Sequence, residues 1–164
     1  MHRRNLMIAG MAAAATFPLT TRSLFAQTAT MDEAKMPALL AGNYATETSR
    51  LAREQATNQT VRIFADLEIA EQAATAQAFG AEPGTGGLRE DHAALLAQLQ
   101  QMQGAEFDRM YIEGQITGHE ELLTIHRTYA AQGTDPMARG ASMVGVPSIE
   151  THLAMLRGIQ NQLG

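Results

Sequence analysis

The spacing of apolar residues is the feature that most constrains this chain. From residue 32 onward, apolar side chains recur three, four and seven positions apart, which is the period of an amphipathic α-helix. Aromatic residues make up only 5% of the chain, and β-branched residues do not alternate with polar ones, so the pattern does not favour strands. The sequence therefore predicts an all-α fold.

Glycine and proline divide this pattern into helices. The first and last pairs of long helices are joined by short turns, whereas a glycine-rich stretch and a short helix separate the second from the third. An interruption is expected near Pro147, where the helix loses a backbone donor. The order predicts a ferritin-like four-helix bundle with a short extra helix between helices two and three. The predicted long helices span residues 32–54, 59–79, 105–131 and 135–163, and the short one residues 88–103.

Residues 1–26 have the composition of an export signal. Arg3 and Arg4 precede an uncharged apolar run that is too short for a membrane span, and the small residue Ala26 precedes the expected cleavage point. The paired arginines resemble the twin-arginine export motif, with the general secretory route as the alternative. We therefore expect a periplasmic protein with one mature domain, residues 27–164, and no membrane anchor after cleavage.

The mature domain is acidic and lacks cysteine. Residues 1–26 hold three of the chain's 12 basic residues and none of its 17 acidic ones, which leaves 9 basic against 17 acidic residues and a net charge of −8. This charge argues against nucleic acid or an anionic membrane surface as a partner. Without cysteine, the chain has neither a disulfide nor a site for a lipid anchor on cysteine.

Four titratable side chains fall on the apolar stripes and should point inward. Glu47 and Glu68 lie ten residues before and eleven residues after Thr57, so their carboxylates should lie at one level of the first helix pair. His119 and His152 occupy the inward stripes of the third and fourth long helices. These four residues are the candidate site.

Carboxylate and imidazole groups inside a bundle support two hypotheses. In the first, the protein is not an enzyme, and these groups form a hydrogen-bonded polar layer without a metal. In the second, they hold iron, manganese, zinc or copper in a metal-binding or metal-dependent redox site, with Glu71 and Gln72 as supporting groups. The absence of the Glu-x-x-His pairs of di-iron bundles favours the first hypothesis. No motif identifies a substrate.

Three further features have simpler interpretations. Asp91-His92 is typical of a solvated helix start, and His126 is expected to be exposed or half-buried. The spacing Gly114-x-x-x-Gly118 would let two copies of the chain pair, but in a soluble helix it more often permits close packing within one chain. Self-association therefore stays open as an alternative.

Several sequence blocks resemble one bacterial family. The most specific are Phe-Asp-x-x-Tyr at 107–111 and Gly-His-Glu-Glu-Leu at 118–122, supported by blocks at 45–52, 64–72 and 152–153. Together they resemble the "domain of unknown function 4142" family over essentially all of the mature domain. The resemblance implies a ferritin-like bundle, a secreted or periplasmic location and no established activity. Many members carry Asp-His where this chain has Glu71-Gln72, so one histidine that could serve as a metal ligand is missing here.

Overall fold

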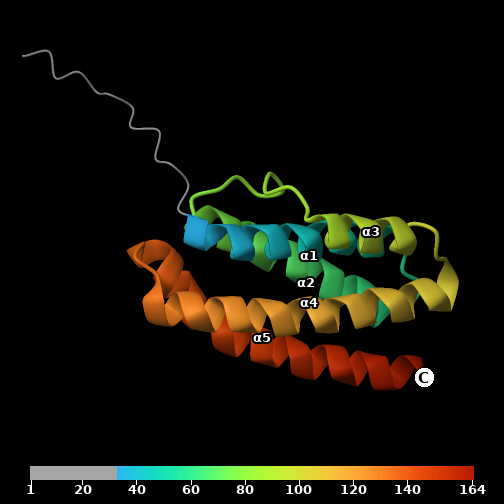
Figure 1. The fold of residues 1–164 in the computed structure, drawn as a ribbon. Helices are drawn as coiled ribbons and strands as arrows, with labels where there is room; N and C mark the ends of the chain where they lie inside the picture. The colour runs from blue at the N-terminus through green and yellow to red at the C-terminus, as the bar shows by residue number, and fades with distance from the viewer. Residues whose placement is uncertain (1–32) are drawn as a thin grey trace, which may run out of the picture. The chain divides into compact units, whose positions relative to one another are not determined.

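The computed structural model describes residues 33–164, and this part of the chain is helical, with no strand. The all-α prediction is confirmed for these residues, and each helix lies close to its expected position (Figure 1). The predicted signal peptide lies outside the described residues. Within the described part, no helix is both long and apolar enough to cross a membrane. The elements are a 3-10 turn at Glu33–Lys35, then α1 (Met36–Gln55), α2 (Gln59–Ala78), α3 (Glu90–Leu99), α4 (Gly104–Gln132) and α5 (Pro136–Leu163).

Polar contacts at the two ends of the bundle establish the direction of the helices. At one end, the carboxylate of Asp108, near the start of α4, accepts hydrogen bonds from the backbone N–H groups of Thr57 (3.0 Å) and Asn58 (2.8 Å) in the α1–α2 turn. At the other end, Lys35 donates to Asp135 in the α4–α5 turn at 2.7 Å. Helices α2 and α4 therefore start at the same end and run in the same direction. The connection that contains α3 returns along the bundle (Figure 1).

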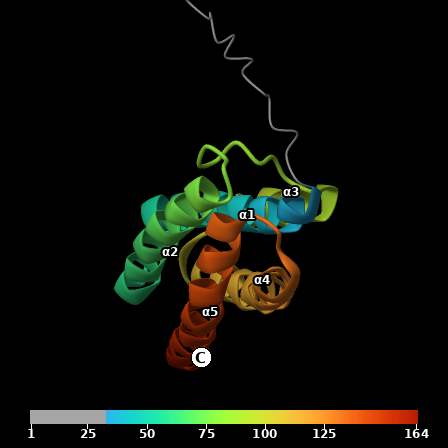
Figure 2. The same cartoon turned by 90° about the vertical axis from the view of Figure 1, so that its left-hand side faces the viewer.

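Helix α1 is enclosed by its neighbours. It packs against α2 and α4, and α3 covers its outer side, away from α5 (Figures 1 and 2). Between Ala41 and Ser49, every residue except Glu47 is buried. The polar residues Thr48 and Ser49 are buried as well, because they face α4, where Thr48 accepts from Gln115 and Ser49 shares a hydrogen bond with Tyr111.

The buried residues form apolar clusters toward the two ends of the bundle, and between them lie a third apolar cluster, with Leu122 and Ile149, and a polar group. Phe64, Phe107 and Leu156 belong to the cluster nearer the α1–α2 turn. Phe79 and Tyr129 belong to the cluster nearer the α4–α5 turn. The polar side chains between these clusters must find partners inside the bundle, because water does not reach them.

Pro147 does not interrupt the last helix. The structure has one continuous α5 that includes this proline, so the expected break is wrong. The proline and its neighbours Met143 and Val144 are exposed. Water can therefore satisfy the carbonyl group that loses its N–H partner, and the helix continues.

Candidate metal centre

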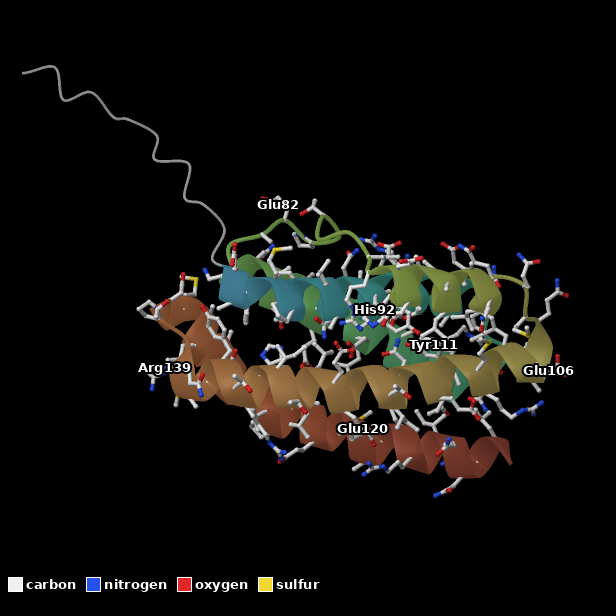
Figure 3. The ribbon with its side chains drawn as sticks, in the orientation of Figure 1. Glu82, His92, Glu106, Tyr111, Glu120 and Arg139 are labelled. Carbon is white, nitrogen blue, oxygen red and sulfur yellow. The ribbon has the colours of Figure 1, made fainter. Side chains whose placement is uncertain are left out.

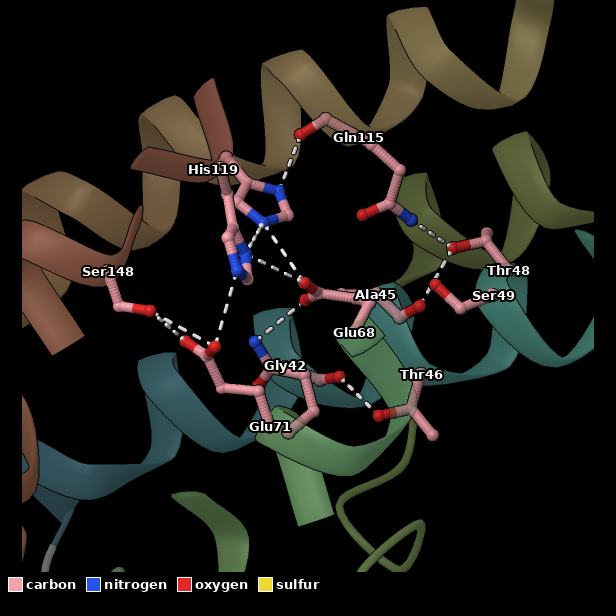
Figure 4. A network of polar contacts seen from close by, with 12 residues as sticks. Gly42, Ala45, Thr46, Thr48, Ser49, Glu68, Glu71, Gln115, His119 and Ser148 are labelled. Carbon is pink, nitrogen blue, oxygen red and sulfur yellow. Dashed lines mark hydrogen bonds and ion pairs between the residues drawn. The ribbon is translucent and has the colours of Figure 1, made fainter. Parts of the chain in front are cut away.

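Three helices bring one carboxylate and two imidazoles together in the middle of the bundle. Glu68 comes from α2, His119 from α4 and His152 from α5, and at most 4% of each residue is exposed. Oε2 of Glu68 lies 3.2 Å from Nε2 of His119 and 3.3 Å from Nδ1 of His152. The two ring nitrogens are 3.3 Å apart. These three atoms form a nearly equilateral triangle (Figure 4), which we call the Glu-His-His cluster.

The outer nitrogen of each imidazole has an acceptor. Nδ1 of His119 lies 2.8 Å from the backbone carbonyl oxygen of Gln115, and a carbonyl can only accept, so this nitrogen carries a proton. Nε2 of His152 lies 3.3 Å from a carboxylate oxygen of Glu71. In a neutral imidazole only one nitrogen is protonated. The inner nitrogens of both neutral rings would therefore present lone pairs to the carboxylate of Glu68.

The groups around the cluster also hold the carboxylates in place. Nε2 of Gln72 donates to Oε1 of Glu68 at 2.9 Å, which leaves Oε2 as the oxygen that faces the imidazoles. The Ser148 hydroxyl donates to the Glu71 carboxylate at 2.8 and 3.0 Å (Figure 4). Glu71 and Gln72, which the sequence analysis named as supporting groups of a metal site, thus both contact members of the cluster. Hydrogen bonds of this kind orient the ligands of metal sites.

The ionisation of the cluster reflects its burial and its partners. Burial alone would raise the pKa of Glu68, but hydrogen bonds and charges from His119 and His152 outweigh burial and lower this pKa to about 2. Burial alone would lower the pKa of His152, but the carboxylates of Glu68 and Glu71 outweigh burial, and the pKa is raised. The carboxylate of Glu68 is therefore ionised at neutral pH.

Gln115 adds an acceptor next to the cluster that the sequence analysis did not identify. The Thr48 hydroxyl donates to the backbone carbonyl of Tyr44 at 2.8 Å, and its oxygen accepts from Nε2 of Gln115, also at 2.8 Å. This chain of bonds fixes the orientation of the carboxamide. Oε1 of Gln115 is buried and has no donor among the described residues, and it points toward the His119 side of the network (Figure 4).

Glu47 does not join the other three candidate residues. Its side chain is 32% exposed, and its carboxylate pairs with Arg50, one turn along the same helix, at 2.6 Å. The expectation that Glu47 points inward is therefore wrong. On α1 the stripe that faces the bundle passes through Thr48, so the neighbouring residue is turned toward solvent.

Two histidines that the sequence analysis treated as solvated are buried. His92, on α3, is 4% exposed and stacks on Tyr44 with 4.3 Å between ring centroids. His126 is 3% exposed and lies 3.0 Å from the hydroxyl of Ser142. Neither belongs to the Glu-His-His cluster. Their burial depends on contacts between helices, which the sequence pattern of a single helix does not reveal.

The helix order and the cluster define a class: an all-helical bundle with a buried carboxylate and two imidazoles at its centre. The chain belongs to the family described as Domain of unknown function (DUF4142), whose model matches residues 19–159. This finding confirms the resemblance of the sequence blocks. Comparisons with curated proteins and with solved structures found no match.

Proposed function

We propose that this protein binds one divalent transition-metal ion through Glu68, His119 and His152. The observation that carries the proposal is the triangle of three potential ligand atoms, Oε2 of Glu68 and the inner nitrogens of His119 and His152. Both imidazoles have an acceptor at the outer nitrogen, so in their neutral forms the inner nitrogens and Oε2 of Glu68 are three acceptors that face one another. A cation at the centre of the triangle would turn this repulsion into three bonds.

The dimensions of the triangle support a metal of the zinc type. Bonds of about 2.0–2.1 Å in a tetrahedral site place the ligand atoms about 3.3–3.4 Å apart. The three separations here are 3.2, 3.3 and 3.3 Å, so an ion would need little movement of the side chains. Two nitrogens and one oxygen also suit iron, manganese or copper. The free Oε1 of Gln115 lies beside the cluster and could accept a hydrogen bond from a water molecule bound to such an ion.

Charge balance gives further support. A divalent cation with the carboxylates of Glu68 and Glu71 gives a net charge of zero inside the bundle. Without a metal, both imidazoles must be protonated to reach the same balance, and two N–H groups must then crowd one carboxylate oxygen. The metal-free polar layer is therefore the alternative that the experiment must exclude.

We further infer a ferritin-like topology and export to the periplasm. The topology is supported by the parallel directions of α2 and α4 and by the long connection between them. Export is supported by Arg3, Arg4 and the uncharged apolar run that follows, which have the composition of an export signal. Cell fractionation, with N-terminal sequencing of the mature protein, tests the export. A chain retained in the cytoplasm with its first 26 residues would contradict it.

Elemental analysis of an untagged protein tests the metal site directly. The protein is treated with a chelator, dialysed, incubated with Zn²⁺ and passed through a desalting column. One zinc ion per chain is expected. Free zinc at a hundredfold excess over its dissociation constant should stabilise the fold by about 2.7 kcal/mol, which corresponds to a rise in Tm of roughly 10 °C for a domain of this size.

Matched variants separate a specific site from general binding. Glu68→Gln and His119→Gln keep the approximate size of the side chain and should abolish zinc binding. His126→Gln changes another buried histidine on the same helix, α4, and should leave the stoichiometry at one. Zinc retained by Glu68→Gln, or no zinc in the folded wild type at any concentration, would leave the metal-free polar layer as the better description.

A further inference from the structure

A second buried site lies beneath α3, apart from the three cluster residues. A cavity of about 270 Å³ separates α3 from α1 and α4. Its lining includes the rings of Tyr44, His92 and Tyr111 and the apolar side chains of Leu95 and Leu99. Leu95 is 41% exposed, so the cavity reaches the surface at this residue. His92 and Tyr111 lie between α3 and α4 in Figure 3.

His92 presents a hydrogen-bond donor that has no acceptor. Nε2 of His92 lies 2.6 Å from Nη2 of Arg89, which can only donate, and 3.5 Å from a carboxylate oxygen of Glu121; the shorter contact makes this ring nitrogen an acceptor. The proton of the neutral ring is therefore on Nδ1. That nitrogen is buried and has no partner among the described residues. A buried donor without an acceptor costs about 1–3 kcal/mol, which a ligand with an oxygen acceptor would recover.

The charges around the cavity favour a neutral ligand. Arg89 is held by Glu121 and Asp91, and Glu113 and Glu121 belong to the lining, so the described residues around the cavity offer an anion no free cation and would repel it. Burial, together with the positive charge of Arg89, lowers the pKa of His92, so the imidazole is neutral at pH 7. The stacked rings of Tyr44 and His92 give the cavity a flat aromatic wall.

The attachment of α3 provides a way in. In this helix only His92 and Leu99 are buried. Arg89, at its start, pairs with Glu121 on α4, and the stretch before it contains several glycines. The side of the cavity formed by α3 is thus held by few buried side chains, and the cavity is reached at its open mouth beside Leu95.

We propose that the cavity beneath α3 binds a small, neutral, planar aromatic molecule whose oxygen atom accepts a hydrogen bond from Nδ1 of His92. The cavity volume of about 270 Å³ equals the share of about nine waters in the liquid, which suits a two-ring compound. None of Glu68, His119 and His152 lines the cavity, so binding there can be tested without a metal.

The probe for this site is 6-propionyl-2-(dimethylamino)naphthalene. It is a neutral two-ring compound with one carbonyl acceptor, and its fluorescence shifts to the blue in an apolar site. Titration of the full mature protein should give saturable binding with a blue shift. His92→Phe keeps the ring stack with Tyr44 but removes the donor, and should weaken binding about fivefold, the equivalent of one neutral hydrogen bond. The analogue without the acyl group should bind both proteins equally.

A pair of leucine variants locates the bound probe. Leu95, at the mouth of the cavity, and Leu67, on α2 outside it, are both 41% exposed. Leu95→Trp should fill the entrance and weaken binding at least tenfold, whereas Leu67→Trp should leave it unchanged. Circular dichroism and thermal melting check that each variant folds. The proposal is overturned if the wild type shows no saturable binding, if the two tryptophan variants bind alike, or if His92→Phe affects both probes equally.

Discussion

The buried imidazole of His126 should make the fold sensitive to acid. Burial lowers the pKa of this group from 6.5 to about 4. The ring lies among Phe79, Ser142 and Gly145, none of which carries a charge that would stabilise an imidazolium. In the folded protein the ring therefore stays neutral at pH values where it is protonated in the unfolded chain.

The sign and size of the effect follow from proton linkage. Above about pH 6.5 the ring is neutral in both states and its titration has no effect on stability. As the pH falls from 6.5 to 4, the unfolded chain takes up the proton first, so the fold loses stability. A difference of about 2.5 pKa units corresponds to a loss on the order of 3 kcal/mol at pH 4 relative to pH 7.

Urea denaturation of the wild type and of His126→Asn at pH 7 and pH 4 measures this loss. The variant keeps a polar group near Ser142 but cannot be protonated. Between pH 7 and pH 4 its free energy of unfolding should therefore fall by about 3 kcal/mol less than that of the wild type. Other titrating groups act in both proteins. His119 lies seven residues away, about 10 Å along the helix, so its contribution should largely cancel. Equal losses in both proteins would refute the assignment to His126.

Three further predictions concern stability. Asp108→Ala leaves the N–H groups of Thr57 and Asn58 without their acceptor and should lower the free energy of unfolding by about 3 kcal/mol in urea denaturation; a loss under 1 kcal/mol would contradict this. Asn58→Ala removes the side-chain cap of α2, which accepts from the N–H of Thr60, and should cost about 1 kcal/mol by the same assay. Pro147→Ala restores a backbone donor inside the continuous α5, so it should raise the free energy of unfolding by roughly 1–3 kcal/mol and raise Tm with it. An unchanged or lower Tm would show that the proline fits without cost.

The sequence predicts the helices well because each depends on a local period. The same period places Glu68, His119 and His152 correctly, since each lies in line with several apolar residues of its own helix. Glu47 fails the same test. Its helix is covered on three sides, and a single-stripe description cannot distinguish it from Thr48, one position further.

The remaining errors also arise from contacts between helices. His92 is buried because α3 lies against Tyr44, and the position of a short helix over its neighbours is not encoded in its own residues. The role of Gln115 depends on a hydrogen bond to Thr48 on another helix. A neutral amide on a buried stripe offers no chemical signal in the sequence.

The aspartates at the two ends of the bundle have a consequence for assembly. Asp108 ties the α1–α2 turn to the start of α4, and Asp135 ties the start of the first hairpin to the second turn. The two helical hairpins, α1–α2 and α4–α5, are thus joined by a polar contact at each end of the bundle, and these contacts define their register. A chain cut within the connection that contains α3 should still assemble from its two pieces, with the hairpins in their native register and without the covalent link between them.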